Sequence, residues 1–524
     1  RVVIGGLLSS SFITLILIPV IYSIIEERFK RKRAGKGTAR GVTPLSGVTA
    51  LLILTTVCIS FINTIQATES DTLKISLRDV LKRSVQHNPM IRIDRIDVDI
   101  AEAVVREQQY RFEPAFSASI KQNRTITDGE SGEPEYEGAV QIAGNLPTGT
   151  DVSLKGSISP GSRSPSSGSA FQRKLEMTFT QALLSEMGPD VNLAPVRKAS
   201  VDLKISNEEL TAYAQKLLAD VERAYWDMYL AEQEVQIHKK SLELANRFLF
   251  ESEEKLNLGR IAPLQLVVVR AELASRKKNL INAQTAYIQK KYRLLYLVND
   301  STLMWNSPIM ITDRPYSPQA PDSLTLHLKA AKEYRPDLVR ANFLLSKGEL
   351  DVIQTRNGLF PKLDVFFTLA GEASARSFQD AFTGDYQGTS LSTGFILSLP
   401  VTNGIARQRY KKSVLSQKKL QISMENLRNL IELDVRSAWT DVNRTMNHIE
   451  AAGISRKLQE EKLNAEQARF AAGKSTEYLV LQVQRDLISS RLDETRAQVA
   501  YCNAVTNLYL KDGTLLERRG VSSK

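Results

Sequence analysis

The residue types that most often bind metals or attack substrates are few and scattered in this chain. Four histidines and two cysteines occur among the 524 residues: His87, His238, His327, His448, Cys58 and Cys502. None of the histidines has a histidine or cysteine partner at helical spacing, and two cysteines cannot form a disulfide framework. No convergent nucleophile, base and oxyanion set and no phosphate-binding glycine motif is present in the sequence. We therefore predict a protein that is not an enzyme, with no cofactor and no metal site.

The net charge does not indicate nucleic-acid binding. The formal charge is +11, but residues 1–67 hold eight Lys or Arg and two acids, which leaves +5 on the other 457 residues. Charges of both signs are spread along helical patterns there, which is typical of a solvated surface. We predict no nucleic-acid partner.

Two apolar segments open the chain. Residues 2–25 would span about 36 Å as a helix, enough to cross a bilayer, and the basic stretch ERFKRKRAGK places the following end in the cytoplasm. Residues 48–65 are less apolar, and a signal-peptidase site could follow at Ala67; a second membrane anchor is the alternative. We expect an inner-membrane-like segment over residues 1–40 and a signal-peptide-like segment over residues 41–67.

The rest of the chain carries one pattern twice. The stretch SLRDVLKRSVQHNPMIR is repeated as SLTLHLKAAKEYRPDLVR, and the prolines of the two copies, including Pro114 and Pro361, stay 247 residues apart. A repeat of this length is a duplicated domain and not a solenoid unit. We place the first copy at residues 68–310 and the second at residues 311–524.

Each copy contains one very long helical pattern. Apolar residues alternate at spacings of four and three through residues 191–258 and 405–472, which is the seam of a coiled coil. The first pattern would be about 100 Å long as a helix. Gly259 and Gly473 then interrupt the two patterns. Return helices are predicted after the glycines, over residues 264–297 and 478–510.

Pro114 and Pro361 are each expected to end a helix. Short segments with alternating polarity lie between each of these prolines and the long helical pattern of the same copy. This period of two, bounded by Gly, Ser and Pro, is typical of transmembrane barrel strands and also of a soluble β-meander. The predicted strands cover residues 115–120, 140–142, 152–158, 175–183, 363–369 and 393–399.

The first apolar segment resembles the last transmembrane helix of RND-family efflux permeases. The stretch GGLLSSSFITLILIPVIY, residues 5–22, carries this resemblance. Either a fusion of permease and channel or two adjacent genes joined in one reading frame would account for it.

Residues 73–513 resemble the TolC-like outer-membrane efflux channels. The motifs that carry the resemblance are the Asn-Pro and Arg-Pro pairs, the two helix-to-strand prolines, and the turns in NLGRIAPLQLVVVRAEL and AAGKSTEYLVLQVQRDL. Two features depart from the family pattern. Ala182 stands where the family usually has proline, and the strand material between Thr125 and Arg173 exceeds the common pattern.

The resemblance implies a mainly α fold with β strands, assembled as a homotrimer. Each chain would give about four strands to one transmembrane β-barrel and its duplicated coiled-coil hairpins to one periplasmic α-helical barrel. Four strands cannot close a barrel, and open sheet edges are not tolerated in lipid. We therefore expect an outer-membrane location with a periplasmic extension, in contact with outer-membrane lipid.

The resemblance also implies partners and sites. A periplasmic adaptor protein would dock on the hairpin tips, and an inner-membrane RND-type transporter would supply the substrate. The matching tip residues are Leu258, Gly259, Arg260, Ile261, Ala472, Gly473, Lys474 and Ser475. Salt links that hold the closed state could form among four charged residues near the tips: Glu253, Glu254, Arg469 and Lys474.

The function predicted from the sequence is a passive conduit from periplasm to exterior in a tripartite efflux system. A channel for protein or peptide secretion and a structural coiled-coil protein without a pore are the alternatives. The permease-like segment favours RND export over secretion, and the strand blocks disfavour a protein without a pore. No motif identifies the substrate.

Overall fold

The computed structural model describes residues 73–521, apart from residues 125, 128–129, 132–134, 161–170, 301–302, 304, 307–308, 378 and 380–384. The permease-like segment (5–22) and the signal-peptide-like segment (41–67) lie outside the described residues. Both copies of the repeat belong to a single compact unit, residues 72–524. Of the helices that the structure describes, none combines the length and apolar character needed to span a bilayer.

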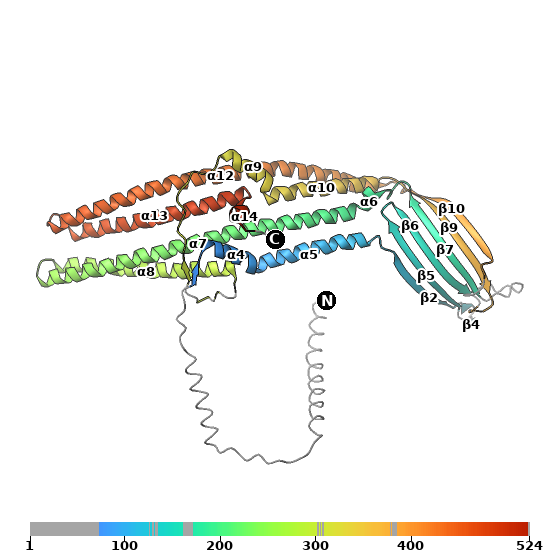
Figure 1. Ribbon diagram of the computed structural model, residues 1–524, viewed down its shortest axis with the longest axis horizontal. Coiled ribbons are helices and arrows are strands. Elements are labelled where there is room, and N and C mark those ends of the chain that lie inside the picture. Colours follow the sequence, from blue (N-terminus) through green and yellow to red (C-terminus); the bar gives the residue numbers. More distant parts are fainter. Residues whose placement is uncertain are drawn as a thin grey trace, which may run out of the picture. The chain divides into compact units, whose positions relative to one another are not determined.

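Long helices make up most of this unit (Figure 1). The first copy forms α4 (Leu77–His87), α5 (Pro89–Tyr110), α6 (Pro189–Asn192), α7 (Ala194–Asn257) and α8 (Pro263–Val298). The second copy forms α9 (Leu324–Tyr334), α10 (Pro336–Asn357), α12 (Gly404–Ala471), α13 (Glu477–Lys511) and α14 (Leu515–Arg518). The four long helices predicted from the sequence are confirmed, each end within three residues.

The helix starts follow from local capping chemistry. The Ser76 hydroxyl accepts a hydrogen bond from the Asp79 N–H at the start of α4. The Asn88 side chain accepts one from the Met90 N–H at the start of α5, whose first residue is Pro89. Such caps satisfy backbone N–H donors that have no partner within the helix. Proline at the first position costs no helical hydrogen bond, because the N–H that it lacks would have had no partner there.

The predicted coiled-coil seams lie in the interior. In α7 seven consecutive seam residues are each less than 9% exposed: Leu210, Ala214, Leu217, Val221, Ala224, Met228 and Ala231. Farther along the predicted seam, Val235, Leu242 and Leu249 are half-buried. In α12, Met424, Ile431, Val435 and Val442 are also each less than 9% exposed. The 4–3 spacing therefore places the apolar stripe of each long helix against its neighbours.

The largest core surrounds the middle of α7, where Tyr225 and Trp226 are fully buried. Two short strands, β1 (Leu73–Ile75) and β8 (Ile309–Ile311), pair in parallel and contribute to this core. The fully buried Glu222 carboxylate accepts hydrogen bonds from Arg519, at 2.9 and 2.7 Å, and from the Tyr316 hydroxyl at 3.1 Å. These bonds attach the C-terminal segment to the first copy.

Six antiparallel strands form one sheet in the order β10-β9-β7-β6-β5-β2. Their bounds are β2 (Ala115–Asn123), β5 (Glu135–Leu146), β6 (Thr150–Pro160), β7 (Phe171–Ala182), β9 (Lys362–Ala375) and β10 (Gly388–Ser398). A small separate pair is formed by β3 (Ile126–Thr127) and β4 (Glu130–Ser131). The family resemblance implied about four strands per chain, and the structure corrects this number. The β5–β6 hairpin, built from the additional strand material of the first copy, accounts for the difference.

Candidate functional site

The pairing of the strands sorts the side chains of the sheet by polarity. Residues directly opposite one another on neighbouring strands project from the same face. One row across all six strands is entirely apolar: Phe116, Ile142, Leu154, Met177, Leu369 and Leu391. The next row projects from the other face and is polar or small: Ser117, Gln141, Lys155, Glu176, Ala370 and Ser390. We call these two surfaces the apolar face and the polar face.

The apolar face is exposed in the single chain. The six side chains of the apolar row are between 38% and 72% exposed. In a water-soluble sheet protein, the apolar face packs on a core and the polar face meets water. An exposed apolar face opposite a polar one is the arrangement of a transmembrane strand, whose outer side chains contact lipid.

The helix-to-strand prolines lie where this sheet joins the helices. Pro114 lies between the end of α5 and the start of β2, and Pro361 lies between α10 and β9. The Cα of Pro114 would be 3.3 Å from a Cβ added at Gly144, so glycine allows this close approach. The Pro361 carbonyl accepts a hydrogen bond from the Ser185 N–H at 3.3 Å.

The hairpin tips lie at the opposite end of the long helices from the sheet (Figure 1). Gly259 and Gly473 adopt left-handed backbone conformations, with φ of +67° and +71°. Each glycine N–H donates to the carbonyl three residues earlier, and the next N–H donates to the carbonyl five residues earlier, at 2.8–3.0 Å. This is the Schellman motif, in which glycine ends a helix without steric cost.

We expect Gly473→Ala to destabilise its tip by about 1–2 kcal/mol, the cost of a left-handed conformation for a residue with a Cβ. A Cβ at this position would meet no atom within 4 Å, so backbone strain is the whole effect. Hydrogen exchange of the α12–α13 turn should therefore become faster.

Gly453→Ala is the matched control for Gly473→Ala. Gly453 lies inside α12, and its added Cβ would lie 3.7 Å from Glu494 Oε1, an ordinary contact. Alanine should stabilise this helix by about 1 kcal/mol. Changes of the same sign in both variants would contradict the assigned tip geometry.

The charged residues near the tips pair within their own hairpins. Glu253 accepts a hydrogen bond from Arg270 at 3.0 Å, and Arg469 lies 3.4 Å from Glu466. Glu466 also accepts a hydrogen bond from the Ser475 hydroxyl. Glu254 and Lys474 contribute backbone groups to the two helix ends. Glu253 and Arg469 would have to leave these partners to form a salt link between the hairpins.

Other contacts connect the first hairpin to the second, and the sequence analysis did not predict them. The Lys255 ammonium of α7 lies 4.7 Å from the ring centroid of Phe470 on α12, and the ring of Phe248 lies 6.5 Å from the same ring. Cation–π contacts of this kind contribute about 0.5–1 kcal/mol at exposed sites. The lone aromatic residue in a charged stretch before Gly473 was the only available signal.

A buried connection is made by the side chain of Arg276 in α8, which is 4% exposed. Its guanidinium donates to Glu272 at 3.0 Å, to the carbonyl and hydroxyl of Ser241 on α7 at 3.2 and 3.1 Å, and to Gln484 on α13 at 3.2 Å. One side chain thus joins three helices of two hairpins.

Glu477, the first residue of α13, is buried at 8% exposure. Within the described part of the chain, neither carboxylate oxygen has a hydrogen-bond partner. Burial raises the pKa of this carboxyl above its ordinary value of 4.5, while the Lys255 ammonium opposes the shift. Ionisation of Glu477 therefore costs free energy in the folded tip.

We expect the stability of the second tip to fall as the pH rises from about 4.5 through the raised pKa of Glu477. The ionised carboxyl is less favourable in the folded tip than in the unfolded chain, so the penalty is absent at lower pH and complete above the raised pKa. Glu477→Gln should remove this dependence and stabilise the tip at neutral pH. Hydrogen exchange of the α12–α13 turn, corrected for intrinsic rates, would measure the stability of the tip at each pH. Identical pH profiles for wild type and Glu477→Gln would contradict the prediction.

Comparison with known proteins identifies the family of the chain. Residues 80–300 and 327–514 match the family model described as outer membrane efflux protein. The chain belongs to the outer membrane efflux protein family. As a member of this family, it is an outer-membrane efflux channel protein, and its fold is that of channels and not of enzymes.

The pyoverdine export outer membrane protein OpmQ of Pseudomonas aeruginosa is 25% identical over 347 residues, which cover 63% of this chain and 69% of OpmQ. The Campylobacter jejuni outer membrane channel CmeC has the same fold, with a TM-score of 0.64 at 15% identity over 84% of this chain and 86% of CmeC. The open state of the Neisseria gonorrhoeae outer membrane channel MtrE gives a TM-score of 0.61 at 16% identity, over 84% and 89% of the two chains.

Proposed function

We propose that this efflux protein is one third of a trimeric channel that conducts substrates passively from the periplasm to the exterior. The observation that carries the proposal is that the sheet and the row of long helices have their open edges on the same two segments of the chain. Among the described strands, β2 and β10 each pair on one side only. The helices that continue them, α5 before β2 and α12 after β10, lie at the two ends of the helix row α12-α10-α7-α5.

The edges of the helix row carry exposed apolar side chains. On α5, Ile93, Ile96 and Ile100 are 47–56% exposed. On α12, Ile405, Leu415 and Ile422 are 57–73% exposed. Joining β10 of one chain to β2 of the next would also bring these two helix surfaces together. The same association would therefore pair the open strand edges and bury the exposed apolar side chains of the helices.

The strand directions are compatible with closure. Because the six strands alternate, β10 of one chain and β2 of the next run in opposite directions and can form an antiparallel pair. Three such chains would close a barrel of 18 strands, a size that leaves an aqueous channel. The polar face would line this channel and the apolar face would contact the lipid of the outer membrane.

The family of the chain and the exposure of the hairpin tips suggest two protein partners. A periplasmic adaptor protein would dock on the eight tip residues 258–261 and 472–475, six of which are exposed, while Ile261 and Ser475 are half-buried. An inner-membrane RND-type transporter would deliver the substrate. By its name OpmQ exports pyoverdine, which favours a small-molecule cargo over secretion of proteins.

Cysteines placed on the two sheet edges test the trimer. Ser117→Cys or Ser119→Cys on β2, each combined with Ser392→Cys on β10, should give a covalent trimer on oxidation, with Cys58 replaced by serine. The native Cys502 is fully buried. The control is Ser157→Cys on β6, combined with Ser392→Cys, because β6 already has two neighbours in its own chain. Monomers alone from the edge pairs would contradict the proposal.

A further inference from the structure

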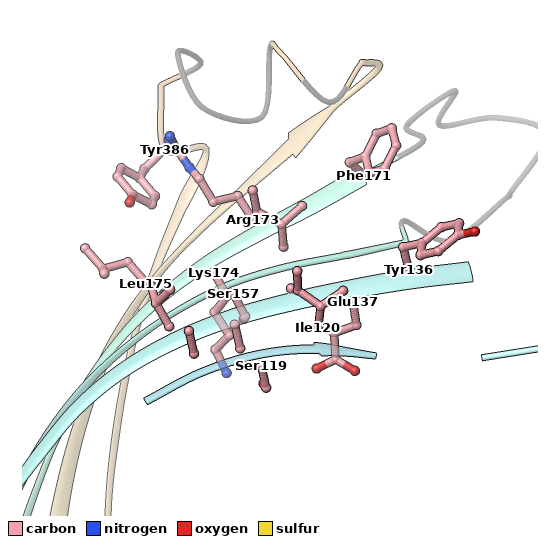
Figure 2. Close-up of a pocket in the computed structure, with 16 residues that line it drawn as sticks. Ser119, Ile120, Tyr136, Glu137, Ser157, Phe171, Arg173, Lys174, Leu175 and Tyr386 are labelled. Atoms are coloured by element: carbon pink, nitrogen blue, oxygen red, sulfur yellow. The ribbon is translucent and has the colours of Figure 1, made fainter. Parts of the chain in front are cut away.

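A cavity of about 690 Å³ lies on the apolar face of the sheet (Figure 2). It is near the strand ends remote from the helices. Its floor contains Gly138 and Gly156, and its walls include Ile120, Val140 and Leu175. A Cβ added at Gly156 would lie 3.6 Å from Val140 and 3.9 Å from Leu175, and one at Gly138 would meet nothing within 4 Å. The two glycines therefore open an apolar groove on the surface assigned above to lipid.

Among the groove-lining residues that project from the apolar face, one side chain, that of Arg173, is cationic. Arg173 lies opposite Ile158 and two residues before Leu175, so it projects from the apolar face. Its guanidinium lies 4.4 Å from the centroid of the Tyr386 ring, toward which it extends in Figure 2. The ring in turn packs on Gly371, where an added Cβ would be only 2.9 Å away. Glycine thus allows the ring to hold the arginine in place.

The free-energy cost of exposing an arginine to lipid limits the depth at which Arg173 can lie in the membrane. An arginine on the lipid face costs about 2–4 kcal/mol at the bilayer midplane and about 0–1 kcal/mol near the interface. Tyr136 and Phe171 lie together at one end of the groove (Figure 2), two residues beyond the level of Arg173 toward the strand ends, and aromatic girdles mark the membrane interfaces of such barrels. Arg173 is therefore placed at the level of lipid headgroups, with the groove extending from it into the acyl layer.

We propose that this groove binds one acyl chain of a phosphate-bearing membrane lipid whose phosphate contacts Arg173. The proposal rests on the membrane-spanning channel proposed above. The groove offers apolar walls to the chain, and the guanidinium offers charge complementarity to the phosphate at the correct end. A guanidinium can stack on an aromatic ring with its face while its N–H edge bonds a phosphate.

Native mass spectrometry of the detergent-purified protein tests the lipid site. Phosphatidylglycerol and diacylglycerol with identical acyl chains are the probes, and they differ in the phosphate headgroup. The wild-type trimer should retain phosphatidylglycerol about tenfold or more better, the effect of a charged hydrogen bond. Arg173→Gln should reduce its retention to that of diacylglycerol, and Gly156→Leu, or Gly138→Leu if the first does not fold, should reduce both.

Lys155→Gln is the matched control, because it removes one positive charge from the polar face at a residue that does not line the groove. It should leave retention of both lipids unchanged. Equal losses in the Arg173 and Lys155 variants, equal retention of the two lipids by wild type, or displacement of phosphatidylglycerol by inorganic phosphate would each overturn the lipid site. These outcomes concern intact trimers, whereas failure of wild type to form trimers would overturn the channel itself.

Discussion

Met177→Arg is expected to lower the yield of membrane-inserted protein about 30-fold or more. Met177 lies near the middle of β7, a central strand, and belongs to the exposed apolar row. If that row faces lipid, an arginine at mid-depth costs about 2–4 kcal/mol, and each 1.4 kcal/mol is tenfold in population. Floating the membranes on a density gradient and quantifying the heat-sensitive trimer on gels would measure the loss.

Thr178→Arg provides the comparison, since Thr178 is the next residue of the same strand and projects from the polar face. Its hydroxyl lies 3.1 Å from that of Thr368 on β9. An arginine here would meet water in the lumen, so insertion should stay near the wild-type level. If both variants lose insertion equally, or if neither loses it, the apolar face does not contact lipid while the polar face contacts water.

Arg276→Met is expected to separate the two hairpins of each chain and to raise the conductance of inserted channels several-fold. Loss of the guanidinium leaves Glu272, which is 13% exposed, without its ion pair, and removes the bonds to Ser241 and Gln484. Breaking one partner of a buried pair costs about 3–5 kcal/mol. Because the bonds join three helices of the two hairpins, that cost loosens the tip end of the helices.

Arg270→Met removes the same charge from the same helix at an exposed position. Arg270 is 62% exposed and pairs with Glu253 at 3.0 Å, an interaction worth about 0–1 kcal/mol. Its conductance should stay close to wild type. An Arg270 variant that opens the channel as much as the Arg276 variant would instead favour the exposed tip salt links as the gate.

The helical part of the fold could be predicted from the sequence because its signals are local. The 4–3 spacing, the Asn88–Pro89 cap and the two glycines act within a few residues of one another, and the long helices were accordingly predicted to within three residues. The strands were harder. Residues 140–142 were predicted as a strand, but β5 spans Glu135–Leu146, because Gly138, Ala139, Ala143 and Gly144 interrupt the alternation without interrupting the hydrogen bonds.

The two faces and the links between hairpins depend on pairings that are distant in sequence. Polarity separates into two faces only when the pairing of all six strands is known, and β7 pairs with β9 across about 190 residues. In the same way Arg276 meets Gln484 across 208 residues. The turn glycines of the tips could therefore be found from sequence, but the side chains that join one hairpin to the other could not.

Single-channel recording of the purified chain in planar bilayers is the most direct test of the central claim, a hollow trimer whose hairpins are held together by Arg276. We predict small, discrete conductance steps for wild type and larger steps for Arg276→Met at unchanged trimer content. Trimers that insert fully but carry no current in either form would contradict the account.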